Sequence, residues 1–483
     1  MRNNLNMKLT ERKIAIQKHA DKHALNRNKW IKKNSYFYND DYSYMHFLVN
    51  DDQRVLDLGC GTGHLLNSLN PSYGLGVDLS KNSINLAKES FPDLVFIQGD
   101  IENVDFIKGI KGVFDVIIIS DTLGYLDDCE EVFSNLHSLC NKDTRIIVAY
   151  HSWKWEPLLK LGEKLRLRMP KVEMNWLSTE DTIGFLHLAD FELVKREWRQ
   201  LIPFKLFGLG SFINRFIGSL PIVRRMSLRN YIVARPMRHV GMNTPSTTVL
   251  IPCRNEKGNI ENAINRIPNF CKELEVIYVE GGSSDGTLEE IHRVIESYPE
   301  KNIKVLTQDG IGKGDAVRKG FDNAQGEVLM ILDADLTVPP EDLTKFYRAI
   351  SSGKGEFING TRLVYPMHDQ AMRFLNFWAN RTFSVLFTWL LNQRLTDTLC
   401  GTKVISKDNY NKLMENRSYF GNFDPFGDFD LIFGATKLNL KIVEVPIRYS
   451  AREYGETQIS RFKHGWLLLK MVLFAHTKLK SFK

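Results

Sequence analysis

The chain has 483 residues, of which 43% are hydrophobic and 25% are charged. This balance is that of a globular protein and argues against disorder, collagen or coiled coil as the dominant state, and the length suggests two to four domains. The net charge of +7 is concentrated in two basic segments, residues 1–35 and 201–240, which are either a surface for anions such as phospholipid or phosphate, or solvated faces.

The cellular setting follows from features that the sequence lacks. Its longest clean apolar stretch runs only from Thr382 to Leu391, whereas a membrane-spanning helix needs about 20 apolar residues. The N-terminus has no apolar segment typical of secretory signals. The six cysteines form no C-x-x-C pair, so we expect a cytoplasmic protein with neither a disulfide framework nor a zinc site. No aromatic-studded binding motif accompanies the basic residues, so no nucleic-acid partner is expected.

Runs of β-branched residues alternate with helical stretches along most of the chain. Such alternation predicts α/β domains with largely parallel sheets. The predicted strands are Arg54–Leu58, Asp115–Ile119, Arg145–Ala149, Thr248–Ile251, Glu275–Val279 and Glu327–Leu332.

Two segments each begin with a strand and a nucleotide-type loop, and the stretch Gly241–Pro245 between them reads as a linker. The two halves share no motif, so internal duplication is not expected. The predicted organisation is a basic N-terminal extension (1–35), a first domain (36–237), a linker (238–246), a second domain (247–460), and a basic and apolar tail (461–483).

The first loop directly follows the strand that ends at Leu58. Its glycines, Gly59, Gly61 and Gly63, permit a tight turn and a close approach of the backbone to a ligand. Asp57 precedes them, where a carboxylate would repel a pyrophosphate but suits a cationic amino-acid group. His64 stands where a dinucleotide-binding loop would have its third Gly or Ala, which argues against a nicotinamide cofactor.

Two further acids follow the next two strands. The number of residues between the loop and Asp78 is that at which a carboxylate typically holds a ribose diol. Asp100 follows the next strand, where its carboxylate could meet the edge of an adenine. The combination resembles class I S-adenosylmethionine-dependent methyltransferases, which implies a Rossmann-like domain. The resemblance implies that Asp57 and the glycines line the methionine end of the cofactor, that Asp78 takes the ribose hydroxyls and that Asp100 takes the adenine.

The methyl acceptor is less defined by the sequence. In the methyltransferase family the segment Phe114–Leu126 ends at the mouth of the site, where Asp121 and Tyr125 could touch a substrate. His151 follows the next strand and is either a base for methyl transfer or a packed or capping histidine.

In the second half, three strands end in polar loops: Val249–Glu256, Val276–Thr287 and Gly326–Asp335. The last of these ends in Asp333-Ala-Asp335. Carboxylates at i and i+2 at the end of a strand can share one Mg²⁺ or Mn²⁺ with a diphosphate, and the metal then neutralises the leaving nucleotide.

These loops together resemble glycosyltransferase family 2, which has the GT-A fold. The resemblance implies an inverting transfer from a nucleotide-diphospho-sugar. Many members of the family have Asp-Asp where this chain has Glu280-Gly281, so the contact to the base stays open. The implied roles are metal binding for Asp333 and Asp335, and nucleotide-sugar binding for Pro252, Glu256, Glu280, Asp285, Lys313, Arg318 and Asp333.

Three further motifs, Asn359–Arg362, Thr396–Lys403 and Glu444–Tyr449, resemble the polyprenyl-phosphate branch of this family, relatives of dolichol-phosphate mannose synthase. In that branch Arg362 and Lys403 would bind acceptor or donor phosphates. Arg452 precedes a loop similar to one that closes on phosphate, although many relatives have Lys where Gln458 stands.

Asp428 and Asp430 precede an apolar helix. One of them is the expected catalytic base if the acceptor is a hydroxyl, but an anionic lipid phosphate would need no strong base. Otherwise the two acids cap the helix.

Residues 371–394 are predicted to form one helix with a polar stripe and a wide apolar face. Trp378 and Trp389 on that face suit a lipid interface, as do the run 466–474 and the phenylalanines of 201–240. Peripheral contact with a membrane is expected; alternatively these faces pack against the domains or a second subunit.

The sequence thus predicts a bifunctional enzyme. It would transfer a sugar from a nucleotide-sugar to a polyprenyl phosphate or related acceptor, using Mg or Mn, and would methylate a related glycan or lipid with S-adenosylmethionine. The alternatives are transfer to a saccharide hydroxyl in polysaccharide synthesis, and a membrane-associated scaffold with an inactive domain.

Overall fold

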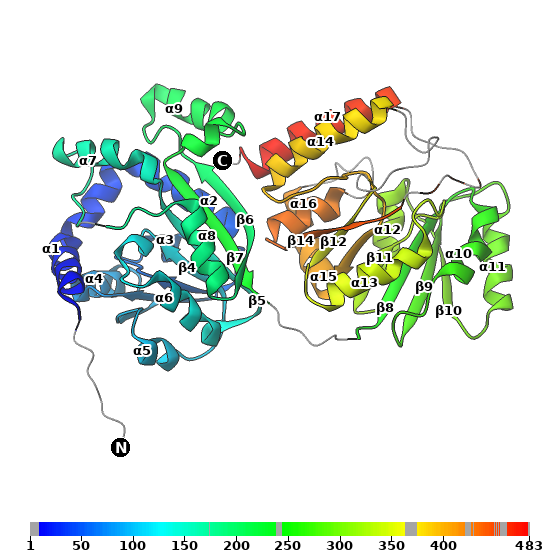
Figure 1. The fold of residues 1–483 in the computed structure, drawn as a ribbon, viewed down its shortest axis with the longest axis horizontal. Helices are drawn as coiled ribbons and strands as arrows, with labels where there is room; N and C mark the ends of the chain where they lie inside the picture. The colour runs from blue at the N-terminus through cyan, green and yellow to red at the C-terminus, as the bar shows by residue number, and fades with distance from the viewer. Residues whose placement is uncertain are drawn as a thin grey trace, which may run out of the picture. The chain divides into compact units, whose positions relative to one another are not determined.

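The computed structural model describes residues 9–172, 174–237, 244–362, 374–420, 427, 429–448, 450, 452, 454 and 461–481, without the side chains of 374–380 and 461–464. The chain divides near residue 237 into two compact units (Figure 1). Each unit has its own seven-stranded sheet. The predicted fold class, two successive α/β domains, is confirmed.

The first unit has the strand order β3-β2-β1-β4-β5-β7-β6. All neighbours are parallel except β7, which runs antiparallel to β5 and β6. The strands are β1 (Arg54–Leu58), β2 (Tyr73–Asp78), β3 (Val95–Gln98), β4 (Phe114–Ser120), β5 (Cys140–His151), β6 (Phe191–Arg199) and β7 (Arg229–Pro236).

Helices cover both faces of this sheet, as parallel strands require. Local capping fixes several of them; Ser178 and Asp181, for example, form a reciprocal capping box at the start of α8. The helices are α1 (Glu11–Lys33), α2 (Ser35–Leu48), α3 (His64–Ser68), α4 (Lys81–Ser90), α5 (Val104–Gly109), α6 (Cys129–Asn135), α7 (Glu156–Lys164), α8 (Thr179–Leu188) and α9 (Leu209–Phe212).

The second unit has the strand order β10-β9-β8-β11-β13-β12-β14. Strand β13 is antiparallel to β11 and β12, and the other neighbours are parallel. The strands are β8 (Thr247–Cys253), β9 (Leu274–Glu280), β10 (Asn302–Thr307), β11 (Val328–Ile331), β12 (Phe357–Thr361), β13 (Lys403–Ser406) and β14 (Ile442–Pro446).

The helices of this unit also flank its sheet (Figure 1). They are α10 (Ile260–Arg266), α11 (Thr287–Ser297), α12 (Lys313–Asp322), α13 (Leu343–Ser351), α14 (Phe374–Leu391), α15 (Lys407–Glu415), α16 (Phe429–Lys437) and α17 (Arg461–Leu479).

The helix predicted over 371–394 is α14, which ends earlier, at Leu391, where Asn392 takes a φ of 57°. Two residues of its polar stripe face inward: the hydroxyls of Ser384 and Thr388 both donate to the carbonyl of Leu395. Helices α14 and α17 lie side by side (Figure 1). Residues 371–373 and the side chain of Trp378 lie outside the described part. None of the described helices is both long and apolar enough to cross a bilayer.

Candidate active sites in the two units

The glycine loop joins β1 to α3 in the first unit. Gly59, Gly61 and Gly63 have φ values of 88°, 55° and 78°, in the left-handed region that favours glycine. A Cβ at Gly59 would also lie 1.9 Å from Oγ1 of Thr122. Both conformation and space therefore require glycine at position 59, and Gly59 and Gly61 line the cavity beside the loop.

Asp57, at the end of β1, is a buried carboxylate without a partner. It is 1% exposed, and among the described residues neither of its oxygens has a hydrogen-bond partner. Burial and the nearby Asp78 raise the pKa of Asp57 to about 7, although Arg27 opposes the shift. An unpaired buried carboxylate is costly, so this position suits a cationic group.

Asp78 lies at the end of β2 and binds the glycine loop directly. Its carboxylate accepts hydrogen bonds from the backbone N–H of Gly61 and of Ser80, each at 2.8 Å. Burial raises the pKa of Asp78. Asp57, Asp78 and the glycines are thus brought together, as the sequence analysis expects.

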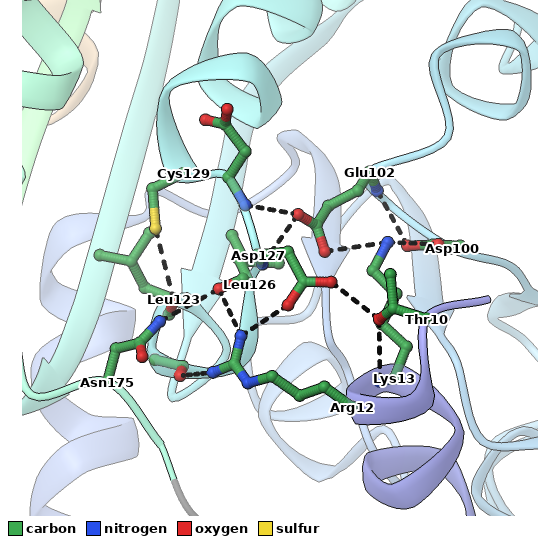
Figure 2. Close-up of polar contacts among 12 residues, drawn as sticks. Thr10, Arg12, Lys13, Asp100, Glu102, Leu123, Leu126, Asp127, Cys129 and Asn175 are labelled. Atoms are coloured by element: carbon green, nitrogen blue, oxygen red, sulfur yellow. Dashed lines mark hydrogen bonds and ion pairs between the residues drawn. The ribbon is translucent and has the colours of Figure 1, made fainter.

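The first turn of α1 is tied to the loops that follow β3 and β4 (Figure 2). Lys13 Nζ lies 2.6 Å from Asp100 and 3.0 Å from Glu102. Arg12 Nη1 lies 2.7 Å from Asp127 and also donates to the carbonyl of Leu126. The acid predicted to meet adenine is therefore engaged by a lysine of the basic extension.

The same helix places Arg27 beside the glycine loop. A Cβ at Gly61 would lie 3.1 Å from Cζ of Arg27, and the guanidinium faces Asp78, Asp121 and Tyr38. Sequence reasoning missed this residue, because residues 1–35 were interpreted as an extension outside the domain. The only available signal was the three- to four-residue spacing of Ala20, Ala24 and Arg27 on one helix face.

A cavity of about 490 Å³ opens beside the loop. Its polar end holds a connected group of side chains: His151 Nδ1 lies 2.8 Å from Asp121 Oδ1, and Arg229 bridges Asp121 to Asp41. The ring of Phe37 stacks on the imidazole of His151, with 5.8 Å between the ring centroids. Burial lowers the pKa of His151 to about 3, so its ring is neutral at physiological pH, with Nδ1–H donated to Asp121.

Two further residues line the cavity, of which the sequence analysis predicts one. Tyr125 lines the cavity, as expected for a residue at its mouth, and burial raises its pKa. Lys171 lines it too and carries no sequence signal. Burial lowers the pKa of Lys171 to about 8. The nearby cations Arg168 and Arg229 lower it further, whereas Asp121 opposes the shift.

In the second unit the predicted aspartates follow β11, and both are paired with cations. Lys313 Nζ lies 2.6 Å from Asp333 Oδ1, and Arg452 Nη2 lies 2.5 Å from Asp335 Oδ2. Arg452 also lies 3.5 Å from Glu256. Burial alone would raise the pKa of Asp333, but the cations around it, Lys313 first, hold it below its usual value.

The nucleotide-binding candidates lie at the carboxyl ends of β8 and β9, where α/β sheets bind ligands. Pro252 belongs to β8. Glu256 accepts a hydrogen bond of 2.7 Å from the side chain of Asn259, and Glu280 accepts one of 2.5 Å from the backbone N–H of Ser283. Asp285 accepts from the N–H of Lys257 and of Thr287 and so orders the start of α11.

Two phosphate-binding candidates already have protein partners. Arg362 binds Asp397 through two hydrogen bonds of 2.6 and 2.8 Å, and Lys403, 1% exposed, donates to the carbonyl of Cys400. Both cations nevertheless contribute to the field at Asp333. Their phosphate-binding role stays a prediction.

The candidate base Asp430 lies in the first turn of α16. Arg417 Nε lies 3.1 Å from its carboxylate and Arg318 Nη1 lies 3.7 Å away. Asp428 and Gln458 lie outside the described residues. The described residues contain no cluster of three or more His, Cys, Asp or Glu side chains able to hold a metal. The two aspartates after β11 nevertheless supply oxygen donors of the kind that Mg²⁺ and Mn²⁺ prefer, with a diphosphate to complete the shell.

Comparisons with known proteins agree with this division. A methyltransferase-domain model matches residues 49–192, and the model of glycosyl transferase family 2 matches residues 248–414. A dolichol-phosphate mannosyltransferase of Pyrococcus furiosus is 37% identical over 119 residues, which are 24% of this chain and 33% of that protein. The chain thus spans about a third of the length of this relative.

A polyprenol monophosphomannose synthase of Mycolicibacterium smegmatis is 25% identical over 224 residues, covering 45% of this chain and 82% of the relative. A solved structure of a S-adenosylmethionine-dependent methyltransferase of Thermotoga maritima, described as a possible histamine N-methyltransferase, is 15% identical. Its alignment covers 46% of this chain and 99% of that one, with a TM-score of 0.35. The first unit of the chain thus contains a match to a methyltransferase domain, and the second unit contains a match to glycosyl transferase family 2.

Proposed function

We propose that the chain is a bifunctional enzyme. Its second unit transfers a sugar from a nucleotide-diphospho-sugar to polyprenyl phosphate, and its first unit methylates a related glycan or lipid with S-adenosylmethionine. The proposal for the second unit is supported by its similarity to a polyprenol monophosphomannose synthase over 82% of that protein's length. The proposal for the first unit rests most on Asp57.

The residues around Asp57 fit the amino-acid end of S-adenosylmethionine. That group carries an ammonium and a carboxylate on neighbouring atoms. Asp57 is a buried carboxylate without a hydrogen-bond partner among the described residues, and the Arg27 guanidinium lies beside Gly61 of the glycine loop. We assign the ammonium to Asp57, the carboxylate to Arg27, the ribose hydroxyls to Asp78 and the adenine to Asp100. When bound, the cofactor supplies an electrophilic methyl group.

We assign to the pair His151–Asp121 the removal of a proton from the methyl acceptor. Because the pKa of His151 is only about 3, the imidazole would take this proton as the acceptor oxygen becomes cationic during methylation. Because Nδ1–H is donated to Asp121, Nε2 is left as a proton acceptor, and no described residue bonds to it. With a hydroxyl acceptor, the bound cofactor would supply the methyl group to the acceptor oxygen, and His151 would take the hydroxyl proton at Nε2. Arg229 and Asp41 hold Asp121 in place.

In the second unit Asp335, together with Asp333, would hold a divalent cation against the diphosphate, and that cation would stabilise the leaving nucleotide. Lys313 and Arg452 now occupy these carboxylates. Both cations are also the groups we assign to phosphates, so substrate binding exchanges one ion pair for another. Arg318, Arg362 and Lys403 supply further positive charge, and Pro252, Glu256, Glu280 and Asp285 border the nucleotide.

The function of the second unit is tested by incubating the protein with polyprenyl phosphate, Mg²⁺ or Mn²⁺ and labelled nucleotide-sugars. Label should enter the organic phase in the wild type and not in Asp335→Ala. Release of nucleotide on addition of saccharides, without organic-phase label, would contradict lipid-phosphate transfer. It would move the acceptor to a hydroxyl and make Asp430 the next residue to replace.

A further inference from the structure

Two segments of the first unit expose much apolar surface. Residues 153–167 and 204–226, here called the apolar rim, hold more than half of the exposed large hydrophobic side chains in the described residues. Helix α7, within the first segment, has no buried residue of its own. In the second segment Leu206 and Phe207 both take positive φ values, and the ring of Phe207 is fully exposed.

Hydrogen bonds join the two segments of the rim. Lys154 Nζ donates to the carbonyl of Arg225 at 3.0 Å, and the indole of Trp155 donates to the carbonyl of Met226 at 2.7 Å. The rim is therefore one surface built on the methyltransferase unit. Exposed apolar patches of this kind mark sites of interaction with proteins, membranes or ligands.

The rim continues into the cavity that holds His151 and Asp121. Leu158, Leu161 and Phe204 line that cavity and are also about half exposed, at 57%, 51% and 52%. The cavity thus offers a path from these exposed apolar side chains to the polar group at His151 and Asp121. A ligand that fills this path is polar at one end and hydrocarbon at the other.

The charge of the rim favours one occupant. Residues 204–226 contain Lys205, Arg215 and Arg225 and no acidic residue; a fourth cation, Arg224, is only 13% exposed and pairs with Glu197. Apolar side chains interleaved with basic ones are typical of surfaces that bind anionic bilayers. A second copy of this chain would bring the same positive charge against the rim, which argues against self-association through it.

We propose that the apolar rim docks on an anionic lipid bilayer, and that the methyl acceptor is a membrane lipid whose polar group reaches Asp121 and His151. The hydrocarbon chain of the acceptor lies along α7. The acceptor assignment rests on the proposed methyltransferase function, whereas docking does not.

Docking is tested by flotation of the full chain with vesicles of phosphatidylcholine alone or mixed with phosphatidylglycerol. The wild type should float with the mixed vesicles, and less at high salt. The double replacement Phe207→Asp and Ile222→Asp should lower the partition coefficient by about tenfold or more, since it removes apolar contact and adds negative charge. Leu188→Asp on α8, at another strongly exposed apolar residue (70%), is the control and should float like the wild type.

A local measurement keeps the test valid if the second unit also binds lipid. Phe207→p-benzoylphenylalanine should crosslink to phospholipid on irradiation, and the same replacement at Leu188 should not. No crosslink to phospholipid at position 207 would overturn docking. A crosslink only to protein would also assign the rim to a protein partner.

The acceptor is tested with labelled S-adenosylmethionine and vesicles made from a lipid extract of the producing cells. Label should enter the organic phase, and Leu161→Asp should abolish it without changing the affinity for S-adenosylmethionine. Cofactor binding with label only in the aqueous phase would overturn the lipid acceptor alone. Absence of cofactor binding would instead overturn the proposed function.

Discussion

At the scale of single residues, the unpaired Asp57 leads to a prediction about how the free energy of unfolding depends on pH. Its pKa is raised to about 7, so the folded state holds a proton that the unfolded state has lost. The stabilising contribution of that proton is complete below about pH 4 and is lost as the pH rises through 7. In the cofactor-free protein at pH 8, Asp57→Asn should therefore raise the free energy of unfolding, by up to about 4 kcal/mol, in denaturant titrations.

The same variant should bind S-adenosylmethionine at least about tenfold more weakly, because it removes the partner of the ammonium. Wild-type binding near pH 7 should release protons, which calorimetry in buffers of different ionisation enthalpy detects. Asp51→Asn, at an exposed acid (side-chain exposure 70%), should change neither property. Destabilisation by Asp57→Asn with unchanged affinity would mean that Asp57 has a structural role.

A second prediction concerns the imidazole of the cavity. With a pKa of about 3, His151 is neutral from pH 5 to 9, so its protonation should not limit methyl transfer in this range. Its lowered pKa costs stability only as the pH falls from about 6.5 towards 3. His151→Gln should lower the methylation rate about 10²- to 10⁴-fold at unchanged affinity for S-adenosylmethionine. A rate unchanged in this variant would contradict the base role.

At the scale of elements, α1 is held over the site by its first turn. The ion pairs of Arg12 and Lys13 are partly buried, and together are worth about 1–2 kcal/mol. Replacing both residues by Met should raise the hydrogen-exchange rate of residues 11–33 about tenfold, and leave that of β1 unchanged. Lys22→Met, at an exposed position of the same helix, is the control. If the double replacement and Lys22→Met showed the same exchange rate over residues 11–33, packing alone would hold α1.

The elements also show what the sequence can and cannot predict. β1 and the glycine loop are local patterns, and β1 has the predicted bounds, Arg54–Leu58. The antiparallel pair β6 and β7 was not predicted, because its pairing is set by contacts across the sheet. The ion pair of Arg229 with Asp41 joins residues 188 positions apart, and no local pattern reports such a pair. Helix α1 is strongly polar, so its contribution to the site becomes visible only once the rest of the unit is folded.

At the scale of the whole molecule, the two sites belong to separate units with separate sheets. Each set of candidate residues, including the pairs Asp57–Asp78 and Asp333–Asp335, lies within one unit. Replacements in one unit should therefore leave ligand binding by the other unchanged, because sites that share no residue or partner behave additively.

The most direct test of bifunctionality applies two labels to one preparation: a nucleotide-sugar labelled in its sugar, with polyprenyl phosphate and Mg²⁺, and S-adenosylmethionine labelled in its methyl group. We expect Asp335→Ala to lose sugar transfer into the organic phase while binding S-adenosylmethionine like the wild type. We expect Asp57→Asn to lose cofactor binding while transferring sugar like the wild type. Sugar transfer that persists in Asp335→Ala, or cofactor binding that persists in Asp57→Asn, would contradict the assignment of these two sites.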